Sequence, residues 1–285
     1  MNNQTEHNIK QALGIVSGLC TFPVKSLTGV IQDEIEATAL GPRGDRRWMV
    51  VRPSGEFLTQ RENHRMTLVL VSETDDGIAL MVPALAPISL TTPKENVIDV
   101  NCWGDSSKAV DAGDVAAAYL SNFLGESVRL VYMPETNTRH VEKAFLDEQT
   151  NNTPLSFADG FPYLLVNEAS VRAFEERLGR SFCSRRFRPN IIIQGTDAFQ
   201  EDSWQRIQIG EVEFDLVKPC ERCVIPAIET NKAERETDVS KALISLRRTL
   251  KARNGVEKNG IYFGQNMVAR NPGIIRRGDS VVLLK

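Results

Sequence analysis

The stretch 213-EFDLVKPCERC-223 joins an alternating apolar and polar run to a Cys-x-x-Cys pair. Residues 213–217 have the period-2 pattern of a half-buried strand, and we expect residues 218–223 to end that strand and enter another. Arg222 stands beside the second thiol, and a neighbouring guanidinium favours the thiolate over the thiol. A thiolate is both the reactive form of cysteine and a soft metal ligand. The stretch therefore predicts a chemically active cysteine in a β-rich part of the chain.

The cysteine pair is open to three other interpretations, namely packing, a structural zinc site and dithiol redox chemistry. Both thiols can simply pack as small buried hydrophobic groups. A structural zinc site would need further ligands, but no second cysteine pair stands at zinc-ribbon spacing, and His7, His64 and His140 are scattered. Thioredoxin-like redox chemistry needs the pair where a helix begins, whereas Val224-Ile225 before a proline is typical of extended backbone. Residue patterns near the pair do not choose between packing and chemistry.

Working outward, short strand-like runs dominate the first hundred residues at the spacing of an antiparallel barrel or sandwich. These runs are residues 13–20, 31–38, 48–51, 67–71, 78–82 and 97–103. A helix should follow, capped by Asp111 or Asp114 and ended by Gly125. Residues 127–133 then return to a strand.

A polar stretch without periodicity, residues 134–157, indicates a linker or a long active-site loop. After it the pattern predicts further strands, a helix over Glu168–Leu178 ended by Gly179, and a helix from Val239 to about Lys251 with Asp238 as its cap. The predicted strands are residues 163–166, 191–193, 205–209, 213–217, 262–268 and 280–284. We therefore predict an α+β, mostly β fold. It comprises an N-terminal β-barrel-like domain, residues 10–135, and a β-barrel domain with flanking helices, residues 155–285.

Composition narrows the classes of function. The chain has 285 residues, of which 41% are hydrophobic and 25% charged, and its net charge is -3, so it is neither disordered nor drawn to nucleic acid or to an anionic membrane. Its most apolar window, residues 79–90, is interrupted by two prolines and is too short to span a bilayer. The first ten residues are polar and show no signal sequence, and the five cysteines do not form a disulfide framework. We expect a cytoplasmic protein without nucleic-acid or membrane partners.

Common motifs of several enzyme classes are missing. The chain carries no G-x-G-x-x-G after a strand, no P-loop, no H-E-x-x-H and no G-x-S-x-G. Dinucleotide binding, P-loop chemistry, zinc peptidase and α/β-hydrolase activity therefore have no support from motifs.

Several segments occur in an order that belongs to a known family. They are 22-FPVKS-26, 45-DRRWMV-50, 57-FLTQR-61, 187-FRPNI-191, 201-EDSW-204, 219-PCERC-223 and 263-FGQN-266. In this order the chain resembles the MOSC proteins that carry a MOSC N-terminal β-barrel domain, among them the mitochondrial amidoxime-reducing component and the bacterial YcbX-like reductases. The resemblance runs from about residue 11 to the end. It implies that the second predicted domain is a MOSC domain.

The resemblance also implies a molybdenum cofactor, molybdopterin with its metal, held between the two domains. Cys223 occupies the position whose thiolate binds molybdenum in the family. The implied cofactor-binding residues are Lys25, Ser26, Arg46, Arg188, Asn190 and Arg222. Such a set suits a buried phosphate, because a dianion needs cations and directed donors. Taken alone, Lys25 or Arg46 is more typical of a solvated surface charge, Arg188 can simply cover core and Asn190 can be an ordinary turn residue. The assignments therefore depend on one another, and Cys220 is expected to be structural.

The chain departs from its relatives near the cysteines. Glu221 stands where the mitochondrial relatives have serine, which places an extra carboxylate near the implied cofactor. Val224-Ile225-Pro226 replaces the threonines that follow in those relatives. No C-x4-C-x2-C ferredoxin pattern is found, so we expect electrons from a separate protein of the ferredoxin, flavodoxin or cytochrome type.

These observations lead to one main hypothesis and two alternatives. The main hypothesis is a molybdenum-dependent oxidoreductase that reduces small N-hydroxylated compounds, namely hydroxylamines, N-hydroxylated bases or amidoximes. Cys223 would hold the metal, and Asp159 is a candidate proton donor. The first alternative is a molybdenum cofactor carrier or sulfur-handling module without reductase activity. The second is a redox-inert scaffold whose cysteines only pack.

Overall fold

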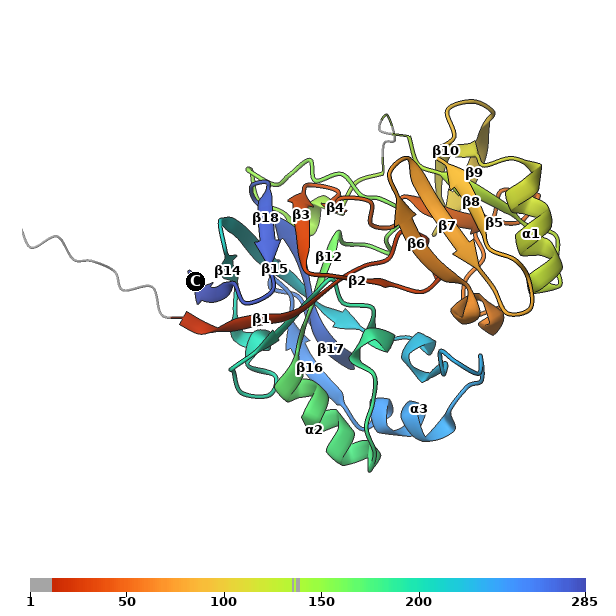
Figure 1. The fold of residues 1–285 in the computed structure, drawn as a ribbon. Helices are drawn as coiled ribbons and strands as arrows, with labels where there is room; N and C mark the ends of the chain where they lie inside the picture. Colours follow the sequence, from red (N-terminus) through yellow and green to blue (C-terminus); the bar gives the residue numbers. More distant parts are fainter. Residues whose placement is uncertain (1–11, 135, 137–138) are drawn as a thin grey trace, which may run out of the picture.

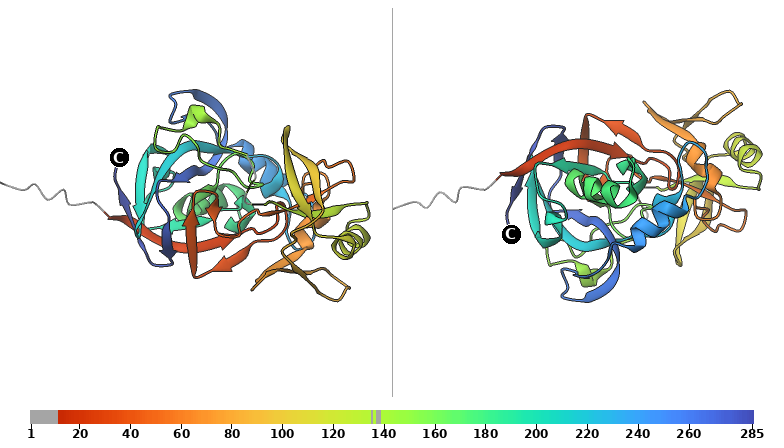
Figure 2. Two further views of the ribbon diagram at one scale, coloured as in Figure 1. Left: turned by 90° about the horizontal axis from the view of Figure 1, so that it is seen from above. Right: turned by 90° about the horizontal axis from the view of Figure 1, so that it is seen from below.

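The structure is a computed structural model that describes residues 12–134, 136 and 139–285. Two lobes lie side by side in all the ribbon views (Figures 1 and 2). Strands predominate in both lobes, so the prediction of an α+β, mostly β fold with flanking helices is confirmed. The expected start of the first domain at residues 10 and 11 and its end at residue 135 lie outside the described residues, as do the ten residues inspected for a signal sequence.

A closed barrel forms the larger lobe. Its seven strands are β12 (Tyr163–Asn167), β13 (Ile191–Gln194), β1 (Ala12–Thr21), β19 (Ser280–Leu283), β14 (Arg206–Ile209), β15 (Val212–Glu221) and β17 (Glu257–Ala269). Neighbours in this order pair with one another, and β17 pairs with β12 to close the ring. Closing the barrel requires a glycine at position 264. Gly264 has φ 77° and lies so close to β12 that a Cβ there would be 2.5 Å from the Leu165 carbonyl oxygen. Two more strands extend the barrel, β2 (Val30–Gln32) beside β1 and β16 (Arg247–Lys251) beside β17.

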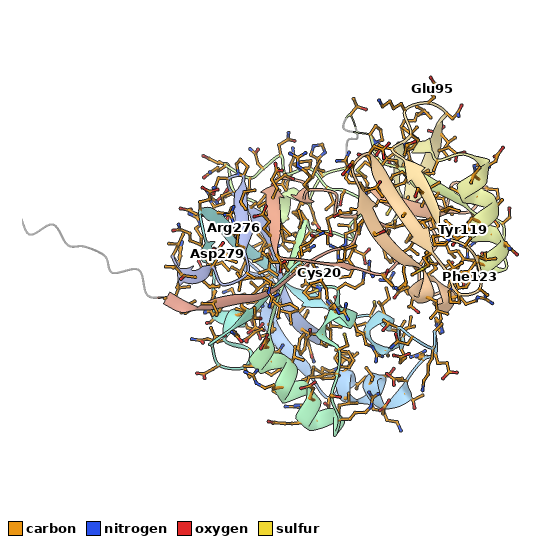
Figure 3. All side chains as sticks on the ribbon, in the orientation of Figure 1. Cys20, Glu95, Tyr119, Phe123, Arg276 and Asp279 are labelled. Carbon is orange, nitrogen blue, oxygen red and sulfur yellow. The ribbon has the colours of Figure 1, made fainter. Side chains whose placement is uncertain are left out.

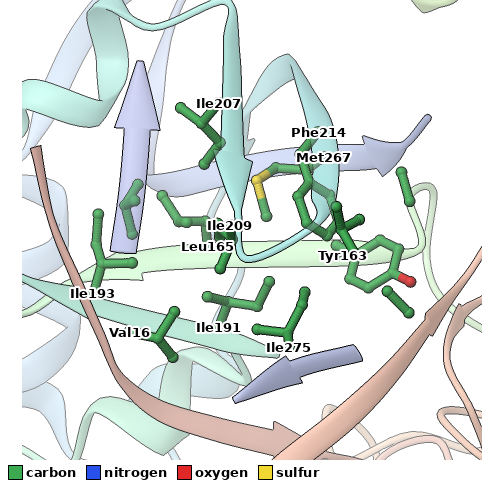
Figure 4. Packing of buried hydrophobic residues seen from close by; sticks show 14 of the residues in the cluster. Val16, Tyr163, Leu165, Ile191, Ile193, Ile207, Ile209, Phe214, Met267 and Ile275 are labelled. Carbon is green, nitrogen blue, oxygen red and sulfur yellow. The ribbon is translucent and has the colours of Figure 1, made fainter. Parts of the chain in front are cut away.

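The barrel interior is filled by side chains that alternate along the strands. On β14, for example, Ile207 and Ile209 are fully buried, while Arg206 and Gln208, which alternate with them, are not. Ile191 and Ile193 of β13 and Val16 of β1 point toward the same core (Figure 4). The interior is therefore a packed core, and any ligand site must lie outside it.

Helices α2 (Glu168–Leu178) and α3 (Thr237–Ile244) cover one side of the barrel (Figure 1). Phe174 of α2 and Val239 of α3 are buried in one cluster against the barrel wall. The Asn167 side chain caps α2 by accepting from the backbone N–H of Ala169, and Gly179 ends it in the left-handed conformation. The expected bounds of this helix are thus confirmed.

The smaller lobe is built from two sheets and one helix. One sheet has the order β5 (Trp48–Val51), β11 (Arg129–Tyr132), β10 (Asp105–Asp111), β9 (Val97–Cys102), and the other has β6 (Leu70–Thr74), β7 (Gly77–Met81), β8 (Ile88–Thr91). Helix α1 (Asp114–Leu124) carries Tyr119 and Phe123 at the end of the molecule farthest from the barrel, whereas Arg276 and Asp279 lie at the other end (Figure 3). A third sheet of β18 (Gly273–Arg276), β3 (Glu34–Thr38) and β4 (Gly41–Pro42) accompanies the barrel.

Five short 3-10 turns complete the described elements. They are η1 (His64–Leu68), η2 (Lys143–Phe145), η3 (Ser184–Phe187), η4 (Gln200–Ser203) and η5 (Ile225–Ala227). No helix of the part that the structure describes is long and apolar enough to cross a membrane.

Three local predictions were wrong. The expected helix from Val239 to Lys251 ends at Ile244, because residues 247–251 form β16 and pair with β17, and this long-range pairing overrides the helical spacing of the leucines. The expected strand over 67–71 is split between η1 and β6. Residues after Cys223 turn into η5 instead of continuing as extended chain, with Pro226 in its first turn.

The expected helix caps also differ from those observed. Gly113, not Asp111 or Asp114, occupies the N-cap of α1, and Glu236, not Asp238, occupies that of α3. Neither residue provides a side-chain cap. Gly125 ends α1 in the left-handed conformation, as expected.

Strand β1 connects the two lobes. It opens the N-terminal part of the chain, yet it pairs with β13 and β19 of the barrel, and β3 likewise pairs with β18. The first and the last thirds of the chain are therefore interleaved in two sheets, the barrel and the sheet of β18, β3 and β4. The domain limits 10–135 and 155–285 stay a prediction.

The part of the predicted connection that the structure describes continuously, residues 139–157, is fixed to the barrel by an ionic cluster. Asp147 accepts from Arg253 Nη2 at 2.9 Å and from Arg270 Nη1 at 2.7 Å, and Arg270 also binds the fully buried Asp215. Burial raises the pKa of Asp147, but the bonds from Arg270 and Thr150 outweigh it, so the net pKa lies well below its usual range. This loop is held in place by charge as well as by packing.

Candidate functional site

A pocket between the two lobes contains every residue implied by the resemblance. Its lining includes Lys25, Ser26, Arg46, Arg188, Asn190, Arg222 and Cys223. These residues are up to 198 positions apart in the sequence (from Lys25 to Cys223). β1 and the turn after it carry the first two from the barrel into the smaller lobe, and Cys20, close to the end of β1, is labelled between the lobes in Figure 3.

Arg46 and Asn190, which line this pocket, form a polar network with the buried Asp45, and we call this network the polar floor. Arg46 Nη1 lies 2.5 Å from Asp45 Oδ2 and donates to Asn190 Oδ1 at 3.1 Å. The Asn190 amide donates in turn to Asp45 Oδ1 at 3.0 Å and to the Cys20 carbonyl at 3.2 Å. Asp45 is only 1% exposed, so its charge needs these partners. The network fixes the Arg46 guanidinium at the junction of the lobes.

Two arginines stack on a single ring beside that floor. The guanidinium carbons of Arg188 and Arg46 lie 4.2 and 4.7 Å from the centre of the Phe22 ring. Arg188 Nη1 donates to the Leu27 carbonyl at 2.6 Å. Burial, followed by the charge of Arg46, lowers the pKa of Arg188 to about 9. Two guanidiniums that lie close together with little solvent around them repel each other. A bound anion would offset this repulsion.

Unsatisfied donors support the same conclusion. Arg188 Nη2 and Arg222 Nε are buried and have no hydrogen-bond partner among the described residues. The remaining donors of Arg222 are engaged, Nη1 with Cys220 Sγ at 2.9 Å and Nη2 with the Phe187 carbonyl at 2.8 Å. Buried donors without partners are rare in folded proteins and call for an explanation. A phosphate or another anion bound in the pocket would supply the missing acceptors.

Backbone conformation sets several of these residues apart. Ser26, Arg46 and Arg188 have φ of 66°, 48° and 60°, in the left-handed region that side-chain-bearing residues seldom adopt. Such conformations persist only where surrounding structure enforces them, and they concentrate at functional sites. Three of the implied cofactor residues therefore show backbone strain that no sequence pattern announced.

At the pocket mouth, Asp159 is surrounded by donors. Its carboxylate pairs with Lys25 Nζ, accepts from Trp103 Nε1 at 3.1 Å and accepts from Arg61 Nη2 at 3.3 Å. Burial raises the pKa of Asp159, but the charges of Lys25 and Arg61 and the bond from Trp103 outweigh it, and the pKa lies well below its usual range. A carboxylate that stays ionised holds no proton to give. This environment therefore argues against Asp159 as a proton donor and suits it to accept hydrogen bonds.

Cys223 is exposed at this mouth. Its Sγ accepts from Arg61 Nη2 at 3.3 Å and from the Ile225 backbone N–H at 3.5 Å. Cys220 is half-buried, packs on the cluster beneath the helices and accepts from Arg222. Within the residues that the structure describes, no three His, Cys, Asp or Glu side chains gather as a metal site. A metal at Cys223 would therefore bring most of its donors with it.

Three residues at the site were not among the predicted ones. Asp45 and Arg61 lie inside the segments 45–50 and 57–61 that carried the resemblance, so these segments could have indicated both residues. Trp103 carried no signal, because its position depends on a hairpin turn whose packing against Asp159 only the fold defines. Glu221 does line the pocket, as its place next to Arg222 suggested.

The chain matches two known domain families, one in each half. Residues 13–127 match the MOSC N-terminal beta barrel domain, and residues 152–282 match the MOSC domain. The chain belongs to the family of MOSC proteins with that N-terminal domain, and the resemblance seen in the sequence is confirmed.

Named relatives extend along nearly the whole chain. The chain is 34% identical to mitochondrial amidoxime-reducing component 1 of Homo sapiens over 96% of its own length and 84% of the relative's. Identity is 31% to component 1 of Xenopus laevis, over 98% and 84% of the two chains, and 31% to component 2 of Homo sapiens, over 95% and 84%.

The pocket fits the cofactor that the family implies. It combines an exposed thiol, several cations and two buried donors without partners among the described residues, and these are the kinds of group that a metal and a phosphate bind. Cations outnumber carboxylates along its lining, with Lys25, Arg46, Arg61, Arg188 and Arg222 against Asp159 and Glu221. An excess of positive charge matches a dianionic phosphate.

Proposed function

We propose that this protein is a molybdenum-cofactor-dependent reductase of N-hydroxylated compounds. The observation that carries the proposal is the pocket between the lobes, where Cys223 shares one lining with buried, partly unpartnered arginines. The names of the relatives support the reaction class, because each is called an amidoxime-reducing component.

In this proposal the two ends of the pocket have different tasks. Cys223 would hold the metal through its thiolate. Arg46, Asn190 and Arg188 would hold the phosphate and pterin on the polar floor, with Arg222 and the Lys25-Ser26 turn alongside. When bound, the cofactor supplies the two-electron chemistry that removes oxygen from nitrogen. The protein's part is to fix that centre beside a polar mouth open to small substrates.

Asp159 has a defined part in the same proposal. Reduction of an amidoxime takes up two electrons and two protons, and it yields an amidine and water. Amidines are cationic near neutral pH, and the ionised Asp159 carboxylate at the mouth would accept hydrogen bonds from their N–H groups. Lys25 and Arg61 keep that carboxylate charged and in place.

Electrons would come from a separate protein of the ferredoxin, flavodoxin or cytochrome type. We also propose a cytoplasmic location, as expected from the sequence, although the relatives are named as mitochondrial proteins.

The proposal is tested by the molybdenum-to-protein ratio and the pterin fluorescence released by oxidation, in protein from a host that makes the cofactor. Cys223→Ser should lose most of the reductase activity with chemically supplied electrons and part of the metal. Cys183→Ser is the matched control, because Cys183 is also exposed but does not line the pocket. Full metal content and full turnover in Cys223→Ser would contradict the assignment.

The carrier alternative predicts a different result. A carrier would hold the pterin, release it to a cofactor-free enzyme and reduce no N-hydroxylated compound even with strong artificial reductants. A protein without pterin or molybdenum would favour the inert scaffold instead.

A further inference from the structure

Trp103 occupies an unfavourable turn. It links β9 to β10 with Gly104, and Cys102 pairs with Asp105 across the hairpin. Both turn residues have positive φ, 61° for Trp103 and 87° for Gly104, as in the type I′ turns that favour Asn-Gly. A bulky aromatic residue with positive φ is a genuine outlier. The sequence thus places tryptophan where local preference is for asparagine or glycine.

The side chain at this turn is held firmly and yet left exposed. Trp103 Nε1 donates to Asp159, the Arg61 guanidinium carbon lies 4.9 Å from the indole centre, and the Phe57 ring lies 5.0 Å away. Even so, Trp103 is 48% exposed, whereas Trp48 and Trp204 are 3% and 5% exposed. Strain together with a fixed, exposed aromatic surface indicates a functional role.

The exposed indole of Trp103 is linked to the candidate site through Arg61. Arg61 Nη2 contacts both Asp159 Oδ2 and Cys223 Sγ at 3.3 Å, so the one guanidinium contacts the indole and the Cys223 sulfur. A molecule resting on the exposed part of the indole and bonding to Asp159 would have its polar end at a carboxylate that shares the Arg61 guanidinium with Cys223. The contacts that fix the ring involve the same two residues that line the pocket mouth.

From this arrangement we propose that Trp103 is the platform on which planar, π-conjugated substrates stack while their N–H and N–OH groups bond to Asp159. This inference rests on the proposed function and adds a determinant of specificity to it. Aromatic amidoximes and N-hydroxylated bases have a face to stack, whereas small aliphatic substrates with the same reacting group do not. Trp103 acts through binding, so its effect should appear in KM more than in kcat.

A matched pair of substrates tests the platform. Benzamidoxime and acetamidoxime share the reacting group and differ in the ring. In Trp103→Asn, whose new residue tolerates positive φ, KM for benzamidoxime should rise roughly tenfold, as loss of one stacked ring predicts. KM for acetamidoxime and kcat for both should stay within about twofold of the wild type, because acetamidoxime has no ring to stack on the indole and the stacking contact acts on binding.

Two further variants separate stacking from other roles. Trp103→Phe keeps a ring and loses the N–H bond to Asp159, so it should retain most of the preference for benzamidoxime. Val97→Thr is the control, because Val97 is an exposed apolar residue of the same hairpin, 59% exposed. Equal changes in KM for both substrates in Trp103→Asn would overturn the platform and leave only a structural role.

A binding measurement does not require the loaded enzyme. Benzamidine should quench the fluorescence of cofactor-free wild-type protein in a saturable way, acetamidine should not, and Trp103→Asn should lose the response. Saturable quenching in a protein that reduces no N-hydroxylated compound would support the platform while the proposed function fails. Reduction with no quenching and no KM effect would overturn the platform and leave the proposed function standing.

Discussion

Arg61 Nη2 lies 3.3 Å from Cys223 Sγ, so a cation from the smaller lobe faces a thiol from the barrel lobe across 162 positions of sequence. The same nitrogen contacts Asp159, which ties the candidate metal ligand and the charged mouth of the pocket to one side chain. This contact makes the site a property of both lobes together.

Removing that guanidinium should reduce turnover. In Arg61→Gln we expect kcat/KM for amidoxime reduction to fall roughly tenfold, because a hydrogen bond from a charged group is lost and Asp159 is less firmly held. Molybdenum content should stay near that of the wild type, since Arg61 is not among the residues proposed to hold the phosphate.

Arg65→Gln is the matched control for this change. Arg65 is exposed, lies one turn away and stacks on Phe123 instead of facing the pocket. Equal activity of Arg61→Gln and wild type would show that the contact to Cys223 has no role in turnover.

A second prediction concerns anion binding by cofactor-free protein. Inorganic phosphate should raise its Tm by about 2–4 °C at tenfold excess over the dissociation constant, because ligand that binds only the folded state adds stability. Arg188→Met should abolish the shift, since it removes a buried donor without a partner. Arg185→Met, which changes an exposed arginine of η3, should leave it intact. A shift reproduced by sodium chloride at equal ionic strength would argue against a specific site.

Acid should loosen the connection over residues 134–157. The pKa of Asp147 is lower in the folded than in the unfolded chain, so its contribution is present above the unfolded pKa of about 3.9 and is lost as pH falls below it. The free energy of unfolding should therefore drop more steeply below about pH 4 in the wild type than in Asp147→Asn. Chemical denaturation at a series of pH values measures both slopes. Parallel slopes would show that Asp147 titrates alike in the two states.

Truncation tests the interleaving of the chain. A fragment of residues 152–285 lacks β1, which pairs with both β13 and β19, and should not unfold cooperatively. Joining residues 12–38 to it through a flexible linker should restore a cooperative thermal transition in circular dichroism. A cooperative transition in the shorter fragment would show that the barrel closes without its first strand.

Local patterns predicted much of the fold. The continuous apolar run Trp48–Val51 and the capped, glycine-ended run of α2 agree with the structure because short-range physics decides them. The strand over residues 247–251 was predicted as helix, because the leucines have helical spacing and the partner strand begins only at Glu257. In the structure, pairing with that strand outweighs the helical spacing. Strand β10 was missed because its polar start, Asp105-Ser106-Ser107, does not alternate.

The site was only partly visible in the sequence. Ordered segments pointed to Cys223 and to the cationic set, and the fold brings them to one pocket. No pattern reveals that Arg46 and Arg188 adopt positive φ, or that both stack on Phe22, because these features depend on contacts between distant segments. Asp45 was overlooked since a lone carboxylate beside an arginine is usually a solvated pair.

Strand β1 has a consequence for synthesis of the chain on the ribosome. Its partner β19 ends at Leu283, so the part of β1 that pairs with β19 stays unpaired until residue 283 has been synthesised, although β2 and β13 pair with β1 earlier. At roughly 5–20 residues per second, this part of the strand is open to other chains for tens of seconds. Nascent chains of this protein should depend on chaperones that shield their leading segment. The pocket needs Lys25 and Asn266 together, so a cofactor can be inserted only after residue 266 has been synthesised.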